Sequence, residues 1–494
     1  MPSHTEEPFS LRFLNACKIH ALRPAIIDWK KGVQRTILYE QLLQDVYRQM
    51  AFIQKEIPEE LVIAVADQQD THTYASFLAL NLLGKTWVPV SIKNPESRNL
   101  HILNEAGCNT VLSSEAFSLQ GFRVLKTNSL PADAEIIPAV NASAQPAYIL
   151  FTSGSTGTPK GVPVFNIQLH AFFDFFMESG PYRFQPSDRF LQVYEAGFDV
   201  SVFVAFSALF TGASLYMMPG RQFLFHEIPF MLDKADITVI SMVPTVLHYW
   251  KPYFKSMRFE KLRYSFFSGD KLLHSLAEQW NSCIPNAEII NSYGPTETTI
   301  VCSHYLWNKE QSQEESLNGV VPLGRLFPGM HSLMKEEDGA FSETEGELCL
   351  AGPQVIPYYL QQASPEKFFR HEGLHFFCTG DRVVKLQSGI FQFVGRTDFQ
   401  VKINGYRVEP GETEAALTAL NSEALCAVLA VQEENGLYVL HAFAEGTGEE
   451  QTLIGELKKV LPAQSVPRSI HFVNPFPLNS NGKPDRAELL KFVR

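Results

Sequence analysis

Clusters of cysteine and histidine are what this sequence most plainly lacks. Its seven cysteines are widely scattered, no two of them form a C-x-x-C pair, and no group of histidines has metal-ligand spacing. Scattered cysteines of this kind are typical of proteins from a reducing compartment and not of zinc or disulfide scaffolds. We therefore expect a reducing environment and no structural zinc site.

Long apolar runs and an excess of basic residues are also missing. No apolar run reaches the roughly 20 residues that cross a membrane, and the first seven residues are polar and acidic, unlike a secretory signal. With 53 acidic and 41 basic residues the formal net charge is -12, which argues against general binding to nucleic acid or to membrane surfaces. We expect a cytoplasmic protein with no nucleic-acid partner and no membrane insertion.

The chain is too long for one hydrophobic core, since cores stop growing at about 250–300 residues, and it has 494. Short apolar strands alternate with helical patterns from residue 24 to residue 151, and a second block of the same kind has strands at 213–217, 237–241, 264–267 and 288–290. This alternation predicts parallel sheets with helices between the strands. An aromatic cluster at residues 172–177 is interpreted as helix core.

The expected pattern of secondary structure changes twice more towards the C-terminus. From about residue 321 short strands separated by turns predict a small antiparallel or barrel-like unit, and beyond residue 398 a compact segment mixes strands and a helix. We predict an α/β protein whose N-terminal domain, residues 1–396, has two stacked αβ sheets and the β-barrel-like unit. A small α+β domain, residues 397–494, would follow.

One loop stands out for its chemistry. Residues 151–161 read FTSGSTGTPKG and directly follow an apolar strand pattern. Glycines let backbone approach an anion, hydroxyls and N–H groups donate hydrogen bonds, and Lys160 adds positive charge. It is not a Walker loop, because Pro159 stands where that motif has glycine. The alternative, an ordinary exposed turn, needs far fewer donors.

Four further strings carry residues with useful chemistry. Taken alone, each could instead be a solvated turn, a linker or, for the last, a lysine without a function. They read NSYGPTETT at 291–299, CTGDR at 378–382, GRTDFQVKINGYR at 395–407 and PLNSNGKPD at 477–485. Tyr293 could stack on a purine, and Thr296 and Glu297 could hold Mg²⁺, which takes one or two protein oxygens. Asp381 suits ribose hydroxyls.

Taken in order, the strings resemble the adenylate-forming ligase superfamily, which contains amino-acid-activating domains of peptide synthetases, acyl- and aryl-CoA ligases and luciferases. The resemblance runs through nearly the whole chain. The strings FDVS at 198–201 and FSALFTGASL at 206–215 resemble the amino-acid-activating branch, where the aspartate, here Asp199, binds the substrate ammonium. A buried carboxylate is costly without a partner, so a cationic substrate would explain Asp199. The alternative is a helix N-cap.

The resemblance implies a role for each matching residue. ATP-binding residues would be Thr152, Ser153, Gly154, Ser155, Thr156, Gly157, Gly269, Asn291, Ser292, Tyr293, Gly294, Asp381 and Arg396, and catalytic residues would be Lys160, Thr296, Glu297 and Lys483. The loop from Thr152 to Lys160 would cover the β- and γ-phosphates, and Tyr293 would stack on adenine while Asn291 bonds its edge. Thr296 and Glu297 would handle the α-phosphate and Mg²⁺, and Asp381 and Arg396 would hold the ribose.

The resemblance also implies two reaction steps. The substrate carboxylate would attack the α-phosphorus of ATP and expel pyrophosphate, with Lys483 bridging the reacting groups, so that positioning and charge neutralisation are the protein's main tasks. The mobile C-terminal domain would then rotate about a hinge at Asp398 and withdraw Lys483. The phosphopantetheine thiol of a carrier protein would take the aminoacyl group.

The substrate pocket follows from the same correspondence. It would be lined by Asp199, Val200, Phe203, Ser241, Phe266, Ser268, Ser292, Ile300 and Val301. Two phenylalanines reduce its volume and three serines add donors, so we expect a small amino acid such as alanine, serine or glycine.

The chain resembles freestanding D-alanine:carrier-protein ligases in length. It has no Gly-Gly pair, and hence no Gly-Gly-x-Ser attachment site, so the carrier would be a separate polypeptide. Ser268 stands where those ligases carry cysteine, which leaves the amino acid and its stereochemistry open.

Two other functions remain open on the sequence alone. An acyl- or aryl-CoA ligase would keep the whole adenylation set but would not need an ammonium-binding aspartate. A non-catalytic carrier-binding protein would be expected to have lost the 151–161 loop or Lys483, and the sequence retains both.

Overall fold

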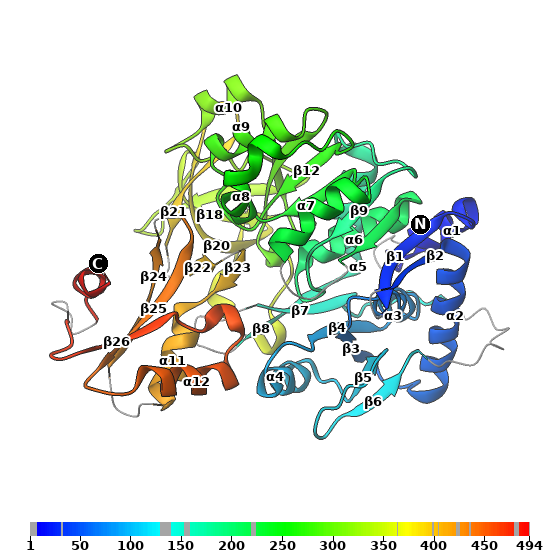
Figure 1. The fold of residues 1–494 in the computed structure, drawn as a ribbon, viewed down its shortest axis with the longest axis horizontal. Coiled ribbons are helices and arrows are strands. Elements are labelled where there is room, and N and C mark those ends of the chain that lie inside the picture. Colours follow the sequence, from blue (N-terminus) through cyan, green and yellow to red (C-terminus); the bar gives the residue numbers. More distant parts are fainter. Residues whose placement is uncertain are drawn as a thin grey trace.

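The computed structural model describes residues 7–30, 33–128, 140–152, 159–218, 224–362, 364–397, 400–403, 405–420, 425–433, 436–478 and 484–493. Figure 1 shows two stacked sheets with helices packed on them, a third sheet beside these, and a smaller C-terminal unit at one side. The chain is thus a mixed α/β protein with a large N-terminal and a small C-terminal part.

The first sheet contains six strands of the described chain in the order β6-β5-β3-β4-β7-β8. They are β3 (Val62–Asp67), β4 (Thr86–Ser91), β5 (Thr110–Ser113), β6 (Arg123–Lys126), β7 (Tyr148–Thr152) and β8 (Lys160–Val164). All pair in parallel except β7 with β8, which are antiparallel. Because β7 ends at Thr152 and β8 begins at Lys160, the predicted phosphate loop joins these two strands.

The second sheet contains nine described strands in the order β15-β14-β13-β12-β11-β9-β10-β1-β2. They are β1 (Pro24–Lys30), β2 (Val33–Leu38), β9 (Arg189–Gln192), β10 (Ser214–Met217), β11 (Val239–Met242), β12 (Tyr264–Phe267), β13 (Glu288–Tyr293), β14 (Ser303–Leu306) and β15 (Arg325–Leu326). The N-terminal strand β1 belongs here, parallel to β10, and not with its sequence neighbours in the first sheet. Sequence rhythm alone could not assign it, because both sheets use the same alternation.

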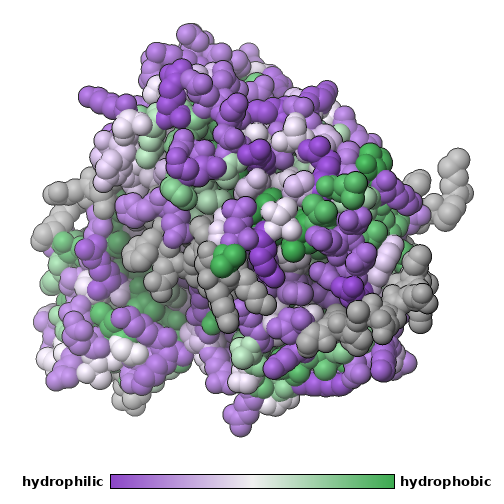
Figure 2. Space-filling view, turned by 45° about the vertical axis from the view of Figure 1, so that its right-hand side comes forward, coloured by the Kyte–Doolittle hydropathy of each residue, from purple (hydrophilic) through white to green (hydrophobic). Residues whose placement is uncertain are grey.

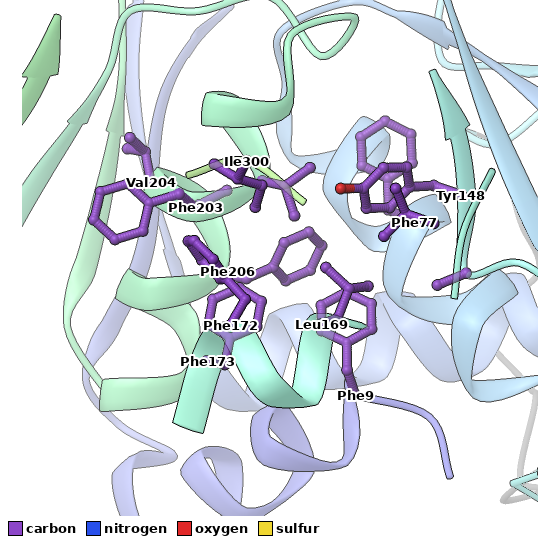
Figure 3. Close-up of a cluster of buried hydrophobic side chains, with 14 of the residues drawn as sticks. Phe9, Phe77, Tyr148, Leu169, Phe172, Phe173, Phe203, Val204, Phe206 and Ile300 are labelled. Atoms are coloured by element: carbon purple, nitrogen blue, oxygen red, sulfur yellow. The ribbon is translucent and has the colours of Figure 1, made fainter. Parts of the chain in front are cut away.

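Apolar helices fill the space between the two sheets. In α3 (Thr71–Leu82) eleven of the twelve residues are buried, and in α6 (Asp199–Thr211) nine of the thirteen are, as expected for helices without a polar face. The aromatic cluster predicted as helix core lies in α5 (Asn166–Asp174) and the π-helical turn Phe175–Ser179, where Phe172 and Phe176 are buried. Figure 3 shows this cluster meeting Phe203 and Phe206 of α6.

Other helices cover the outer faces and the ends of the sheets. They are α1 (Leu11–His20), α2 (Tyr39–Glu56), α4 (Glu96–Ala106), α7 (Leu224–Lys234), α8 (Thr245–Trp250), α9 (His274–Cys283) and α10 (Lys309–Glu315). In the described part of the chain no helix has the length and apolar character needed to cross a membrane. Hydrophilic residues cover most of the face seen in Figure 2.

The third sheet is antiparallel and corresponds to the predicted barrel-like unit. Its strands are β16 (His331–Lys335), β17 (Phe341–Ser342), β18 (Glu345–Ala351), β19 (Phe368–His371), β20 (Leu374–Lys385) and β21 (Phe391–Arg396). The long strand β20 pairs with β18, β19 and β21, so the CTGDR string is held from two sides. Asp381 lies opposite Arg396 in this register.

The C-terminal unit begins with a hairpin of β22 (Val401–Ile403) and β23 (Tyr406–Val408). It continues with α11 (Pro410–Leu420), β24 (Cys426–Gln432), β25 (Tyr438–Glu445), α12 (Glu450–Val460), β26 (Ser469–Val473) and α13 (Arg486–Leu489). Ile403 and Val408 pack into the core of this unit, so the hairpin is anchored there. The elements change character between Arg396 and Val401, close to the predicted boundary at 396/397, which itself stays a prediction.

The same hairpin docks on the large part of the chain. Gly405 has a φ of +83°, and a Cβ there would approach Val243 Cγ1 to 2.2 Å, so only glycine fits. The Tyr406 ring packs edge-on against Phe198, with ring centroids 4.9 Å apart. A mostly buried ion pair between Arg98 of α4 and Glu412 of α11, 2.6 Å long, adds a second contact.

Candidate active site

A cavity of about 300 Å³ lies where the two stacked sheets, the third sheet and the C-terminal hairpin meet. It is reached by the carboxyl ends of β9, β11, β12 and β13, the edge at which open α/β sheets bind ligands. Predicted site residues that line it are Thr152, Asp199, Val200, Ser268, Gly269, Tyr293, Gly294, Thr296, Ile300, Asp381 and Arg396. A more open depression of about 650 Å³ around Trp307 is lined by none of them.

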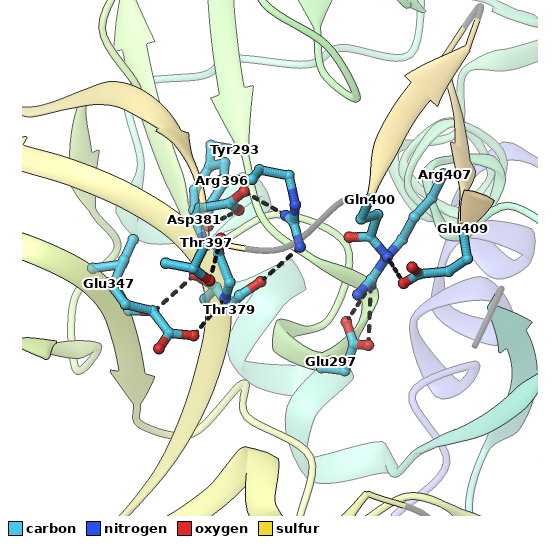
Figure 4. Close-up of polar contacts among 12 residues, drawn as sticks. Tyr293, Glu297, Glu347, Thr379, Asp381, Arg396, Thr397, Gln400, Arg407 and Glu409 are labelled. Carbon is cyan, nitrogen blue, oxygen red and sulfur yellow. Dashed lines mark hydrogen bonds and ion pairs between the residues drawn. The ribbon is translucent and has the colours of Figure 1, made fainter. Parts of the chain in front are cut away.

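At one end of the cavity, Tyr293, Asp381 and Arg396 are joined by hydrogen bonds. Tyr293 Oη donates to Asp381 Oδ2 at 2.7 Å, and Arg396 Nη1 donates to Asp381 Oδ1 at 2.5 Å (Figure 4). Burial and the nearby Asp381 raise the pKa of Tyr293 well above its usual value, so this hydroxyl keeps its proton. The strings at 291–299, 378–382 and 395–407 therefore meet at this end of the cavity, and their roles in binding ATP stay predictions.

Asn291 is placed differently from the other predicted adenine-binding residues. Its Nδ2 donates to the backbone carbonyls of Val321 and Pro322, at 3.3 and 2.8 Å. The side chain thus ties β13 to the segment before β15, and Asn291 is not among the residues that line the cavity. Its contact with an adenine edge stays a prediction.

Glu297 is fully buried and has two partners that the sequence analysis did not assign. Arg407 Nη1 donates to both carboxylate oxygens at 3.0 Å, and Tyr359 Oη donates to Oε1 at 2.6 Å. Burial favours the protonated form, but the charge of Arg407 and these hydrogen bonds outweigh it, so the pKa of Glu297 is lowered. Figure 4 shows Arg407 reaching Glu297 from the hairpin.

Lys160 lies on the other side of Tyr359. It begins β8, opposite Thr152, and its Nζ is 5.7 Å from the centre of the Tyr359 ring, within reach of a cation–π interaction. Burial lowers the pKa of Lys160, although Glu409 and Glu366 act in the opposite direction. Lys160, Tyr359, Glu297 and Arg407 therefore form a continuous chain of contacts from the predicted phosphate loop to the hairpin.

Asp199 is the first residue of α6, and Phe198 occupies the N-cap position. The carboxyl group therefore does not cap the helix, and the N-cap alternative for Asp199 is wrong. Burial is the main cause that raises the pKa of Asp199 to about 6, and nearby Glu297 adds to it, while a hydrogen bond with Thr296 opposes the shift. A carboxylate held at such a cost is suited to a cationic partner inside the cavity.

The remaining substrate-pocket predictions divide into two groups. Val200, Ser268 and Ile300 line the cavity with Asp199, whereas Phe203, Ser241, Phe266, Ser292 and Val301 are buried but do not line it. Phe203 and Phe266 pack edge-on at 5.2 Å within the core, behind the cavity wall. The two phenylalanines therefore fill space in the core behind the cavity wall.

Ile300 reaches the cavity through an unusual backbone. Thr299 and Ile300 have φ values of +58° and +73°, a region that non-glycine residues rarely adopt and that β-branched residues avoid. Gln354 holds the segment, because its Nε2 donates to the carbonyls of Thr298, Thr299 and Val301. Such backbone strain is typical of functional sites. Nothing in the sequence TETTI at residues 296–300 predicted it.

Seven predicted site residues fall outside the described residues: Ser153, Gly154, Ser155, Thr156, Gly157, Asp398 and Lys483. The described neighbours of Lys483 belong to the C-terminal unit, where Leu478 pairs with Pro484 and Arg486 donates to the Val428 carbonyl. Beyond Gln464, no described residue lines the cavity. The C-terminal unit therefore faces the cavity with the hairpin and with Pro462, Ala463 and Gln464.

Sequence reasoning missed several residues of the site. Tyr194, Lys402, Tyr406 and Arg407 all line the cavity. A signal for the last three was present, since apolar residues alternate with basic ones before and after an Asn-Gly turn at 404–405, which is typical of a hairpin. Among the described residues no group of three or more His, Cys, Asp or Glu could hold a metal ion.

The geometry can be compared with known proteins. The family model described as "AMP-binding enzyme" matches residues 13–360, more than half of the chain. The chain belongs to the AMP-binding enzyme family. Its motifs and relatives make it an adenylate-forming enzyme of the peptide-synthetase adenylation type.

Three similar proteins show how far the likeness extends. Zwittermicin A synthase ZmaJ of Bacillus cereus is 29% identical over 92% of this chain and 90% of its own length. The L-allo-isoleucine:holo-[CmaA peptidyl-carrier protein] ligase of Pseudomonas savastanoi pv. glycinea is 29% identical over 98% of this chain and 83% of its own. The Vibrio cholerae adenylation domain AlmE, solved with glycyl-adenosine-5'-phosphate, has a TM-score of 0.84 and 24% identity, and the match covers 100% of this chain and 99% of AlmE.

Proposed function

We propose that this AMP-binding enzyme joins a small α-amino acid to AMP, with release of pyrophosphate from ATP, and passes the aminoacyl group to the phosphopantetheine thiol of a separate carrier protein. The observation that carries the proposal is Asp199, a carboxylate at the cavity wall whose pKa is raised to about 6 mainly by burial. An α-ammonium group would supply the missing charge partner. A fatty or aromatic acid would leave the carboxylate without one.

The size of the substrate is limited by the wall behind Asp199. Phe203 and Phe266 are buried and in contact there, and Val200 and Ile300 add apolar surface. These side chains occupy the space that a large substrate side chain would need. A small amino acid is therefore favoured.

The other proposed roles follow from the positions of the groups. Tyr293, Asp381 and Arg396 would hold adenosine at one end of the cavity, and Lys160 would approach the β- and γ-phosphates with the loop that precedes it. Lys483 would join the α-phosphate and the carboxylate. The protein's contribution would be alignment for in-line attack and neutralisation of charge on the phosphoryl oxygens.

Glu297 and Thr296 offer oxygen ligands, the kind that Mg²⁺ prefers. Bound there, Mg²⁺ would neutralise phosphate charge. In the present arrangement both Glu297 oxygens accept hydrogen bonds from Arg407, and Oε1 also accepts one from Tyr359. Glu297 can therefore serve a metal once Arg407 has moved away.

We infer that this arrangement belongs to the second step, thioester formation. The hairpin with Arg407 faces the cavity, while the described residues beside Lys483 lie elsewhere on the C-terminal unit. Rotation about Asp398 would exchange these two faces between the steps. A lysine that completes the first step must leave before a thiol can enter.

The proposal is tested by ATP–pyrophosphate exchange with a panel of amino acids and of fatty and aromatic acids. Exchange should depend on small amino acids, and Lys483→Ala should abolish it while circular dichroism and thermal melting stay near those of the unchanged protein. Asp199→Ala should lose exchange with amino acids selectively. Exchange driven only by non-amino acids would identify an acyl- or aryl-CoA ligase, and no exchange with any acid would point to a non-catalytic carrier-binding protein.

A further inference from the structure

The register of the second sheet places one row of residues at the carboxyl ends of its strands. Val239 pairs with Phe190, and Phe267 pairs with Met242 and with Asn291. Continuing this register past the ends of β9, β11 and β12 sets Tyr194, Val243 and Ser268 in line with Ser292 of β13 on one face, because paired residues of adjacent strands point to the same side. Tyr194, Val243 and Ser268 of this row line the cavity.

The polar members of this row have no hydrogen-bond partner within the described chain. Tyr194 Oη, Ser268 Oγ and Ser292 Oγ are all buried atoms that make no hydrogen bond to any described residue. The residues Ser268 and Ser292 are only 5% and 6% exposed. Leaving a buried hydroxyl unpaired costs about 1–3 kcal/mol in proteins, so a row of them indicates partners that the chain itself does not supply.

The hydroxyls lie close to one another and to Asp199. Burial raises the pKa of Tyr194, the hydroxyls of Ser241 and Ser268 oppose this, and the charge of Asp199 adds to it. The two serine hydroxyls are near Tyr194 Oη without meeting the geometry of a hydrogen bond. Tyr194 Oη and Ser268 Oγ therefore form a small polar patch on a wall that is otherwise made by Val200, Val243 and Ile300.

The partner of this patch has to be uncharged and small. A hydroxyl group can both donate to and accept from tyrosine and serine hydroxyls. An anionic side chain would meet Asp199 at close range, and a cationic one would find only hydroxyls besides the carboxylate already used for the ammonium. The neighbouring Phe203 and Phe266 leave little depth.

We propose that the substrate is a small hydroxylated α-amino acid of serine or threonine size, whose side-chain hydroxyl is bound by Tyr194 and Ser268. This inference rests on the proposed function, since it takes Asp199 as the ammonium site. It assigns Tyr194, five residues before Asp199, a role in specificity. A site built to hydrogen-bond a hydroxyl rejects the analogue that lacks it, because its own buried groups are then left unpaired.

The test compares pairs of amino acids that differ by the hydroxyl or by its replacement with a methyl group. ATP–pyrophosphate exchange is measured with serine against alanine, and with threonine against valine, and glycine is included. The unchanged enzyme should favour the hydroxylated member of each pair by at least ~10-fold in kcat/KM. Tyr194→Phe and Ser268→Ala should each reduce this ratio at least ~3-fold, because they should raise the KM for serine more than the KM for alanine.

Ser207→Ala is the matched control. Ser207 Oγ is also buried and makes no hydrogen bond in the described chain. It lies about two turns after Asp199 in α6, however, and does not line the cavity. Its removal should leave the serine-to-alanine ratio unchanged. Thermal melting of all three variants shows whether they fold, and Ser268→Thr, which keeps a hydroxyl, should retain more of the preference than Ser268→Ala.

The outcomes separate the two proposals. If alanine or glycine is activated as well as serine, the hydroxyls are satisfied by water and the inference is overturned, while amino-acid activation stands. If serine is preferred but Tyr194→Phe keeps the full ratio, the role of Tyr194 is overturned. If no amino acid supports exchange, the proposed function itself fails.

Discussion

The stability of the folded chain depends on whether the carboxyl group of Asp199 carries a proton. Its pKa is raised to about 6 from an ordinary value near 3.8, mainly because the cavity wall excludes water. Between these two pH values the folded chain binds this proton and the unfolded chain does not, so the contribution to stability is present at low pH and is lost as pH rises through 6. The groups that face it include Glu297, Arg407 and Thr296.

Asp199→Asn is therefore expected to stabilise the ligand-free protein near neutral pH. The gain in the free energy of unfolding should approach ~3 kcal/mol at most at pH 7.5 and should vanish near pH 4. Denaturant unfolding of both proteins across this range measures it. A gain that is independent of pH would show that the buried charge of Asp199 is not its cause.

The same carboxyl group should shape the kinetics. In the free enzyme, kcat/KM for the amino acid should fall below about pH 6, because a protonated Asp199 cannot pair with an ammonium group. The matching profile for Asp199→Asn should be lower and should lack this acid limb. An unchanged acid limb would assign it to another group.

Among the elements, the β22–β23 hairpin is the one whose role depends most on position. Its apolar side, with Ile403 and Val408, packs into the C-terminal unit, and Arg407 extends to Glu297. A buried ion pair adds little net stability, but removing one member leaves an uncompensated charge. The hairpin thus ties the small unit to the carboxylate that the first step is proposed to use for a metal.

Arg407→Ala should separate the two half-reactions. Thioester formation with a carrier protein should fall at least ~10-fold, because the hairpin loses its charged contact, while pyrophosphate exchange, which uses the other face, should change less. Carrier loading from isolated aminoacyl adenylate and pyrophosphate exchange measure the two steps. Arg486→Ala, which breaks a pair with Glu414 inside the small unit, is the control and should lower stability without changing this ratio.

How much of this could be read from the sequence depends on the length scale of the signal. Strands such as Tyr148–Thr152 and the joint position of Tyr293, Asp381 and Arg396 followed from local patterns and motif order, whereas the domain boundary at 396/397 stays a prediction. The placement of β1 beside β10 did not, because sheet membership is decided by tertiary packing. The hydrogen bond from Arg407 to Glu297 could not be predicted either, because it joins residues 110 positions apart in the sequence.

At the scale of the whole molecule, the pair Arg98–Glu412 marks the present arrangement. It joins α4 to α11 at 2.6 Å and is mostly buried. If the small unit must rotate to bring Lys483 to the cavity, these two positions must separate during the first step. Their distance therefore reports which step the enzyme is prepared for.

Cross-linking Arg98→Cys to Glu412→Cys with a bis-methanethiosulfonate reagent, which replaces the length of the two side chains removed, is expected to prevent the rotation between the two steps. The cross-linked double variant should lose pyrophosphate exchange by at least ~100-fold and recover it on reduction, while it still transfers an aminoacyl group from isolated adenylate to the carrier. Each single variant, treated with the same reagent, is the control. Undiminished exchange in the cross-linked protein would show that no such rotation is needed.

Lys402 and Arg407 are opposite each other across the two strands of the hairpin. Like charges in that position repel, and the repulsion is offset at the cavity by Asp381, Asp270 and Glu297. The two basic residues and these carboxylates attract each other while the small unit is still approaching the cavity. Dissolved ions should screen that attraction, because the Debye length is about 8 Å at physiological salt. The small unit should consequently dock more slowly as ionic strength rises, and salt should slow carrier loading more than it slows adenylation.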